Sequence, residues 1–461
     1  MKALTAFTLA AIGLSAPSLA AETPPKAEVE GADALSVDFG ANLRVRQEFM
    51  HNVPGLPGGG LLSRAPNGKT RNHMRFRPSV WGEAKAGDSL RLYTRLTDEF
   101  RANLRPKSHA TSVPDEMIVD NLFLDGTGLF DGLVDFRVGR QDIYHLYGLD
   151  HVFGDGTPGD GSRTVFSDMV RATLHVDERS RIDVFALMNR DKNDLRWGTR
   201  RCRNRRLTAL SPSYEPEMDD WGWGVVWSSS IGEALPYQVF AMEKRTASFH
   251  ERNGAKHPST RREMAGAKVC PKLTDEWSLQ FEGMSEIGEN GRDESILAWS
   301  GYAGVNWRSS SDGAKPFASL GLHYMSGDKD AARQDGGRRA WDPMWARSVN
   351  DSEMFLYGTH YGAAWWSNMY FAKLSGGVDI ASHHRVSAFS GPMYSAADDG
   401  LGGGDGDFKG LLSGIRYDFP LYSRKRFEVF GHAYAEAFNP GDYFEGRRGA
   451  HFLRWQVDVK F

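Results

Sequence analysis

The chain ends in the stretch FLRWQVDVKF, residues 452–461. Its side chains sort by parity: one face carries Leu453, Trp455, Val457, Val459 and Phe461, and the other Arg454, Gln456, Asp458 and Lys460. Successive side chains of a β-strand point to opposite faces of a sheet, so the stretch is predicted to be a strand with one apolar and one polar face. We expect the apolar face to contact lipid and the polar face to line a water-filled lumen. Pairing of this strand with the first one, near Phe39 to Phe49, would close a barrel.

The same alternation recurs along the chain. It is clear in DFGANLRVRQEF (38–49), HMRFRPSVWGEAK (73–85), SLRLYTRLTDE (89–99) and MVRATLHV (169–176). Strands of about ten residues have the length that a tilted strand needs to cross a bilayer. The pattern therefore indicates a series of membrane-crossing strands.

The connections between these strands alternate in length. AGDS (86–89), DERS (177–180), LTDE (273–276) and YSRK (422–425) are short, whereas the intervening connections are long, polar and rich in glycine. Short periplasmic turns and long extracellular loops are typical of outer-membrane barrels. We predict an all-β fold, a transmembrane antiparallel β-barrel of about 18 strands. Both termini would lie on the periplasmic side, which requires an even number of strands.

The N-terminus has the pattern of a secretory signal peptide. Lys2 supplies a positive charge, residues 3–16 are largely apolar, and Ser18-Leu19-Ala20 provides a small-residue cleavage site. The predicted organisation is a signal peptide over 1–20, a periplasmic spacer over 21–36 and a barrel over 37–461. The predicted location is the outer membrane of a Gram-negative bacterium.

Composition favours a membrane barrel over a soluble β-sandwich or propeller. The mean hydropathy is −0.48, yet the chain has 51 glycines and 13 tryptophans. Aromatic residues crowd the predicted strand ends, as in WGWGVVW (221–227), where interfacial girdles would lie. The polar face carries several arginines per strand, which a dry core would not tolerate. The net charge of −3 gives no whole-chain footprint for nucleic acid.

Arginines dominate the polar parity of the predicted strands. A ring of guanidinium groups attracts anions and binds carboxylates through forked donors. Because Glu48, Glu83 and Glu99 share this face, an Arg–Glu ladder that braces the wall is an alternative interpretation. The predicted pore-lining residues are Arg44, Arg46, Arg75, Arg77, Arg91, Arg95, Arg137, Arg140, Arg171 and Arg454.

One internal segment resembles a known family. VGRQ (138–141), followed by DGTPGDGSRTVF (155–166) and MVRATL (169–174), is similar to the alginate-export family of outer-membrane porins. The resemblance implies an 18-stranded barrel with a narrow, arginine-rich constriction through which an anionic polyuronate leaves the periplasm. Arg140 and Arg163 match motif positions. Arg140 nevertheless shares parity with Val138 and not with Arg137, so either Gly139 marks a bulge that re-aims it or the strand ends there.

The loop GDGTPGDG (154–161) has too few carboxylates for a calcium loop, and we predict no metal site. Asp155, Asp160 and Arg163 are instead candidate charges at the mouth or constriction. The chain has two cysteines, Cys202 and Cys270, which an oxidising compartment would permit to pair; the sequence leaves this open.

Taken together, these features predict a channel for anionic polysaccharide or oligosaccharide and no cofactor. The alternatives are a general or small-anion porin and, from another class, an outer-membrane enzyme or adhesin with a closed barrel. No nucleophile elbow of the G-x-S-x-G kind is present, and we predict no enzyme activity. Expected partners are the anionic sugar, outer-membrane lipid and lipopolysaccharide, the barrel-assembly machinery through the C-terminal strand, and periplasmic export components.

Overall fold

The computed structural model describes residues 35–53, 70–105, 116–143, 146–153, 166–190, 196–198, 219–250, 256–292, 294–311, 313–329, 338–345, 352, 367–380, 383–400, 402–446 and 448–461. The predicted signal peptide, Asp155, Asp160, Arg163 and Cys202 lie outside these residues. Within them no helix is long and apolar enough to cross a membrane. The elements are β1 (Leu35–His51), β2 (Thr70–Ala86), β3 (Leu90–Thr97), β4 (Phe100–Arg105), β5 (Glu116–Gly128), α1 (Leu129–Gly132), β6 (Val134–Gln141), η1 (Leu146–Gly148), β7 (Ser167–His175), β8 (Arg181–Asn189), β9 (Arg196–Gly198), β10 (Asp220–Ile231), β11 (Leu235–Thr246), β12 (Phe249–His250), β13 (Lys256–His257), β14 (Thr260–Val269), β15 (Trp277–Asn290), β16 (Ser295–Arg308), β17 (Lys315–Met325), β18 (Met369–Ile380), β19 (His384–Tyr394), β20 (Phe408–Arg424), β21 (Phe427–Pro440) and β22 (Ala450–Lys460).

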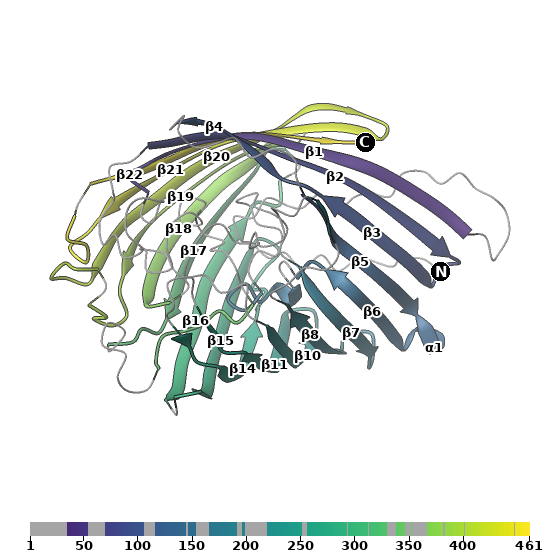
Figure 1. Cartoon of the computed structure of the whole chain (residues 1–461), viewed down its shortest axis with the longest axis horizontal. Helices are drawn as coiled ribbons and strands as arrows, with labels where there is room; N and C mark the ends of the chain where they lie inside the picture. The colour runs from purple at the N-terminus through teal and green to yellow at the C-terminus, as the bar shows by residue number, and fades with distance from the viewer. Residues whose placement is uncertain are drawn as a thin grey trace.

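The strands form one closed antiparallel barrel. Hydrogen bonding joins 20 of the described strands into a single sheet. β3 and β4 both pair with β2 and together make one crossing, and β9 is a three-residue piece against the start of β5. The barrel therefore has 18 crossings, as predicted, and they follow one another around it in chain order (Figure 1).

The first and last strands close the barrel. β1 pairs with β22 from Asn42 opposite Lys460 to His51 opposite His451. Beyond this ladder the backbone N–H of Ala41 donates to the carbonyl of Phe461 at 2.6 Å. The predicted parity is confirmed, because Leu453 is 50% exposed on the outside while Arg454 is 4% exposed on the inside.

Short turns join the strands at one end of the barrel, which we call the turn end, and long connections join them at the other, the loop end. The predicted turns at 86–89, 177–180 and 273–276 all lie at the turn end, together with the start of β1 and the end of β22. The outer face between the two ends carries exposed apolar side chains, among them Val80, Leu92, Val138, Val170, Val184, Leu320 and Leu322.

The largest apolar cluster lies inside the barrel. Two stretches of the loop-end connections, residues 146–153 and 338–345, contribute fully or nearly fully buried Leu149, Val152, Phe153, Trp341 and Trp345. We call these two stretches the inserted segments. They pack against the interior face of strands β7 to β19, which is rich in methionine, a side chain that adapts to irregular surfaces. The methionines of this cluster include Met169, Met242, Met264, Met284, Met325, Met369 and Met393.

Candidate pore wall

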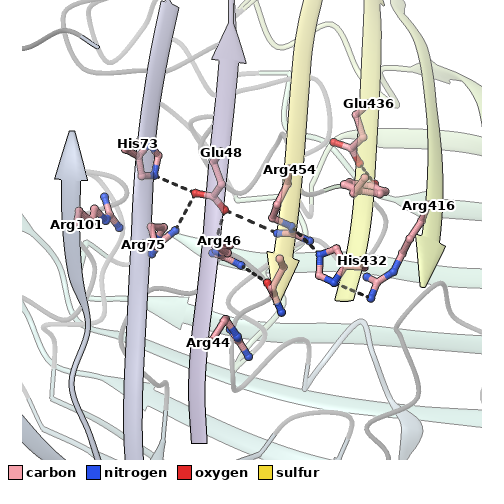
Figure 2. A network of polar contacts seen from close by, with 12 residues as sticks. Arg44, Arg46, Glu48, His73, Arg75, Arg101, Arg416, His432, Glu436 and Arg454 are labelled. Atoms are coloured by element: carbon pink, nitrogen blue, oxygen red, sulfur yellow. Dashed lines mark hydrogen bonds and ion pairs between the residues drawn. The ribbon is translucent and has the colours of Figure 1, made fainter. Parts of the chain in front are cut away.

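A buried carboxylate organises the charged part of the interior. Glu48 on β1 has no exposed surface and lies among three arginines and a histidine (Figure 2). Its oxygens are 3.0 Å from Arg46 Nη2, 2.9 Å from His73 Nε2, 3.4 Å from Arg75 Nη1 and 3.8 Å from Arg454 Nη1. These side chains meet because strand alternation sends them to one face, and because β2 and β22 flank β1. Glu48 therefore links β2 and β22 across β1. We call the junction of β1 and β22, where the first and last strands meet, the seam.

The polar network continues from the seam into the last strands. Arg454 Nε donates to His432 Nε2 on β21 at 3.1 Å, and Arg416 Nη2 on β20 is 3.4 Å from His432 Nδ1. Arg416 in turn forms a salt bridge with Asp418 at 2.6 Å. Figure 2 shows Arg454, His432 and Arg416 pointing toward one another from adjacent strands. We call the interior-facing Arg44, Arg46, Arg75, Arg77, Arg95, Arg101, Arg416 and Arg454, with their partners, the arginine wall.

A bulge in β5 extends the arginine wall on its other side. The register between β3 and β5 shifts between Arg95 and Leu96, which leaves Asp120 as the extra residue on β5. Asp120 is fully buried and lies 2.9 Å from Arg95 Nε and 3.9 Å from Arg77 Nη2. Arg95 also reaches Asp142 at 3.0 Å. The bulge thus places a carboxylate between two arginines of neighbouring strands.

Toward the turn end the side chains of the ion pairs are more exposed to solvent. Arg44 on β1 binds Asp458 on β22 at 3.2 Å. Asp125 on β5 bridges Arg91 on β3, at 2.8 Å, and Arg137 on β6, at 2.6 Å. Such carboxylates shield part of the positive charge without removing it.

Exposure divides the predicted arginines into two groups. The side chains of Arg46, Arg75 and Arg454 are 0%, 2% and 1% exposed, so they brace the wall as the ladder interpretation expected. The side chains of Arg44, Arg91 and Arg137 are 23%, 33% and 26% exposed and can touch a solute. Arg77 and Arg95 lie between these groups, at 9% and 19%.

Arg140 lies apart from these arginines. β6 continues through Gly139, whose φ is +127°, and keeps its register with β5 and β7, so the strand does not end there and no bulge re-aims it. Arg140 keeps the parity of the exposed Val138, binds Asp168 at 2.9 Å and lies against the ring of Phe166. Its pairing gives no support to the prediction that it lines the pore beside Arg137.

Arg171 lies on the interior parity of β7, opposite Arg137, and next to Tyr147 of the first inserted segment. Burial raises the pKa of the Tyr147 phenol above its ordinary value, so the ring stays neutral. Arg171 therefore lies where the arginines of the interior meet the first inserted segment.

Polar anchors hold the inserted segments in place. Lys268 Nζ donates to the carbonyl of Gly148 at 2.5 Å, and Lys244 Nζ donates to that of Met344. His151 lies 2.8 Å from Ser300 Oγ on β16 and 3.1 Å, ring nitrogen to ring nitrogen, from His323 on β17.

The two inserted segments also bind each other. The backbone N–H of Trp345 donates to the carbonyl of Val152 at 3.2 Å, and the rings of Phe153 and Trp345 stack with centroids 5.3 Å apart. Both rings contact Phe185 on β8. The segments therefore form one packed unit in the barrel interior.

The sequence interpretation missed this unit, although a signal was present. Ile143, Leu149, Val152 and Phe153 are apolar residues in a connection that was predicted to be a polar loop. It also missed His73, His432 and Asp120 as members of the arginine wall; Asp120 was out of reach because its orientation depends on the bulge.

The described residues contain no group of three or more His, Cys, Asp or Glu side chains arranged to hold a metal ion. Cys270 is a half-buried free thiol in the structure.

Several solved structures of other proteins have a fold similar to that of this chain. The chain matches OccAB1 of Acinetobacter baumannii with a TM-score of 0.53 at 9% identity, over 95% of this chain and 100% of that one. OccK5 (OpdH) of Pseudomonas aeruginosa matches with 0.53 at 10% identity, over 92% and 98% of the two chains. The outer membrane protein OprD of the same species matches with 0.51 at 10%, over 92% and 94%. The fold is that of an outer-membrane porin.

No protein-family model and no curated protein matches the chain. At about 10% identity the structural likeness concerns the fold and not the solute. The closed barrel and its exposed apolar band place the chain in the outer membrane of a Gram-negative bacterium, as the signal-peptide and strand patterns predicted.

Proposed function

We propose that this barrel is a channel for anionic saccharides, with an alginate-like polyuronate as the finer assignment. The observation that carries the proposal is the set of partly exposed arginines on the interior face, Arg44, Arg91 and Arg137. Guanidinium groups bind carboxylates in a forked geometry and keep their charge at any physiological pH. Several such groups at moderate spacing give weak, repeated contacts, which favour passage over trapping.

The polyuronate assignment is supported by the sequence resemblance of segment 134–176 to alginate exporters. Export would run from the periplasm, at the turn end, to the outside. In this proposal no catalytic step and no cofactor is involved; the solute moves down its own gradient through a positive field.

A channel for small anions or single sugar acids is the second candidate. The inserted segments favour it, because residues 146–153 and 338–345 occupy part of the interior and are held there by buried aromatic rings. A polymer would have to pass beside them along the arginine wall, whereas a monomer requires less room.

Single-channel recording in planar bilayers separates these functions. A polyuronate channel shows resolved openings that oligomannuronate of about six residues interrupts and that a neutral maltooligosaccharide of equal length does not. A small-anion channel is interrupted by monomeric glucuronate and not by the hexamer. A silent barrel, or equal blocking by charged and neutral oligomers, would contradict both.

The arginines are tested with the combined change Arg44→Gln, Arg91→Gln and Arg137→Gln. We expect blocking by the uronate to become at least tenfold weaker, since each lost charge-assisted contact is worth about 1.5 kcal/mol or more. Arg261→Gln is the matched control, because Arg261 is a paired surface arginine on the outward parity of β14.

A further inference from the structure

Next to the exposed arginines, three aromatic side chains line up across neighbouring strands. Trp81 on β2 stacks on Tyr93 of β3 with ring centroids 6.2 Å apart, and Tyr93 stacks on Phe123 of β5 at 5.1 Å. All three share the interior parity of their strands with Arg91 and Asp125. We call Trp81, Tyr93 and Phe123 the aromatic row.

The row is fixed at both of its ends. At one end the Trp81 ring lies against the seam, where a Cβ added to Gly40 would come within 2.7 Å of it. At the other end Arg137 lies 4.1 Å and Arg91 5.5 Å from the Phe123 ring centroid, close enough for cation–π attraction. Phe123 is 6% exposed under these guanidinium groups, whereas Trp81 and Tyr93 are half-buried.

Charged side chains flank the row on both sides. Asp125 accepts hydrogen bonds from Nε and Nη2 of both Arg91 and Arg137. Glu83 pairs with Lys85 at 2.7 Å and with Arg91 at 3.4 Å. On this flank three cations thus face two carboxylates, whereas on the Trp81 flank Arg95 is paired with Asp120 and Asp142. Among the described residues, none accepts a hydrogen bond from Arg137 Nη1, so this donor remains for a ligand.

A uronic acid has an apolar C–H face and a carboxylate, and an aromatic ring beside a cation can contact both. A pyranose ring has an apolar C–H face whose hydrogens suit the negative face of an aromatic ring. The carboxylate at its C5 position requires a donor about one ring width away, in the plane of the sugar. Neither a simple inorganic anion nor a neutral sugar uses both features.

We propose that the aromatic row with Arg91 and Arg137 is a binding subsite for one uronate residue, with the sugar packed against Tyr93 and its carboxylate between Arg91 and Arg137. This inference rests on the proposed function and deepens it. Tyr93 follows the start of β3 by three residues, so the subsite lies about 10 Å along the strand from the turn end. It therefore lies in the part of the interior that a solute entering at the turn end reaches early.

Calorimetric titration of the detergent-solubilised full chain tests the subsite independently of conduction. Glucuronate is the probe, and glucose and acetate are its neutral and ring-free counterparts. We expect glucuronate to bind more tightly than either. Tyr93→Leu should weaken glucuronate binding roughly fivefold, as expected for a lost aromatic contact, and should leave acetate unchanged. Arg137→Gln should weaken it at least tenfold and affect acetate as well.

Matched controls separate the subsite from general effects. Phe430→Leu removes an interior ring that lies beside Lys460 on the opposite side of the seam, and Arg181→Gln removes an open interior arginine paired with Asp183. Both should bind glucuronate as the wild type does. Heat-modified migration on gels verifies that each variant is folded.

The outcomes distinguish the two proposals. Wild-type affinity in Tyr93→Leu or in Arg137→Gln, or an equal loss in the controls, would overturn the subsite, even if the channel is anion-selective. Intact, Tyr93-dependent binding in a barrel that conducts nothing supports the subsite and contradicts the proposed channel.

Discussion

The two sides of the barrel interior fill their space by different means. On the arginine wall, from β20 through the seam to β5, charged side chains are buried by one another, with Glu48 and Asp120 at the centres. On the side from β7 to β19, methionines and phenylalanines are buried by the inserted segments. Buried charges are tolerated only in pairs, whereas an apolar face needs only an apolar cover. A selective surface is therefore expected on the first side and a steric restriction on the second.

On the charged side, we expect the largest loss of stability for Glu48→Gln. The change leaves Arg46, Arg75 and Arg454 buried around a neutral group, and the loss of a buried partner costs about 3–5 kcal/mol. We expect a correspondingly lower urea midpoint for unfolding from lipid vesicles. Glu263→Gln, at a pair that is more than 40% exposed, should cost less than about 1 kcal/mol. Equal midpoints for the two variants would show that Glu48 does not organise the wall.

Phe153→Ala tests the packing of the inserted segments on the apolar side. Removing a fully buried aromatic ring costs about 3 kcal/mol, and here the lost contacts include the stack on Trp345 and the edge contact with Phe185. The inserted segments should detach more often, so single-channel conductance should rise and its noise should increase. Anion selectivity should persist, because Arg44, Arg91 and Arg137 are untouched. A variant with lower conductance, or with lost selectivity, would show that the two sides are not separable.

The seam is tested without changing any charge by Gly40→Ala. The new Cβ would meet the Phe461 carbonyl at 2.6 Å and the Trp81 ring at 2.7 Å, and overpacking of this kind costs about 1–3 kcal/mol. Gly283→Ala is the control, because its Cβ would meet nothing within 4 Å. We expect a lower unfolding midpoint only for Gly40→Ala. A midpoint equal to that of Gly283→Ala would mean that the Trp81 ring and the Phe461 carbonyl move aside without a measurable loss of stability.

The smallest effect on stability is expected for Arg44→Gln. The pair with Asp458 is partly exposed, and such pairs contribute about 1 kcal/mol or less. The urea midpoint should hardly change, while the current carried by anions should fall. A large loss of stability would place Arg44 with the bracing arginines and not with those that touch a solute.

Much of the fold was predictable because the side chains of a β-strand alternate with a period of two residues, so that even a short stretch shows the pattern. Alternation in 38–49, 73–85 and 452–461 determines which side chains face inward, and the short turns determine where the strands reverse. The interior arginines follow from the same parity, as Arg44, Arg75 and Arg454 show.

What could not be predicted depends on three-dimensional details. Asp120 faces Arg95 because a bulge adds one residue to β5, and no local pattern announces that residue. Which arginines are buried depends on the surrounding carboxylates and not on the parity of the strand. The inserted segments belong to long connections, whose course is set by contacts with distant strands such as β8 and β14.

The partly exposed arginines Arg44, Arg91 and Arg137 are expected to select the solute. The most direct measurement is the reversal potential of single channels in a tenfold KCl gradient, for the wild type and for the Arg44→Gln, Arg91→Gln, Arg137→Gln variant. We predict an anion-selective wild type and a variant shifted to cation selectivity, because Asp125 and Asp458 would lose their partners. A reversal potential that is unchanged in the variant would show that these arginines do not select the solute.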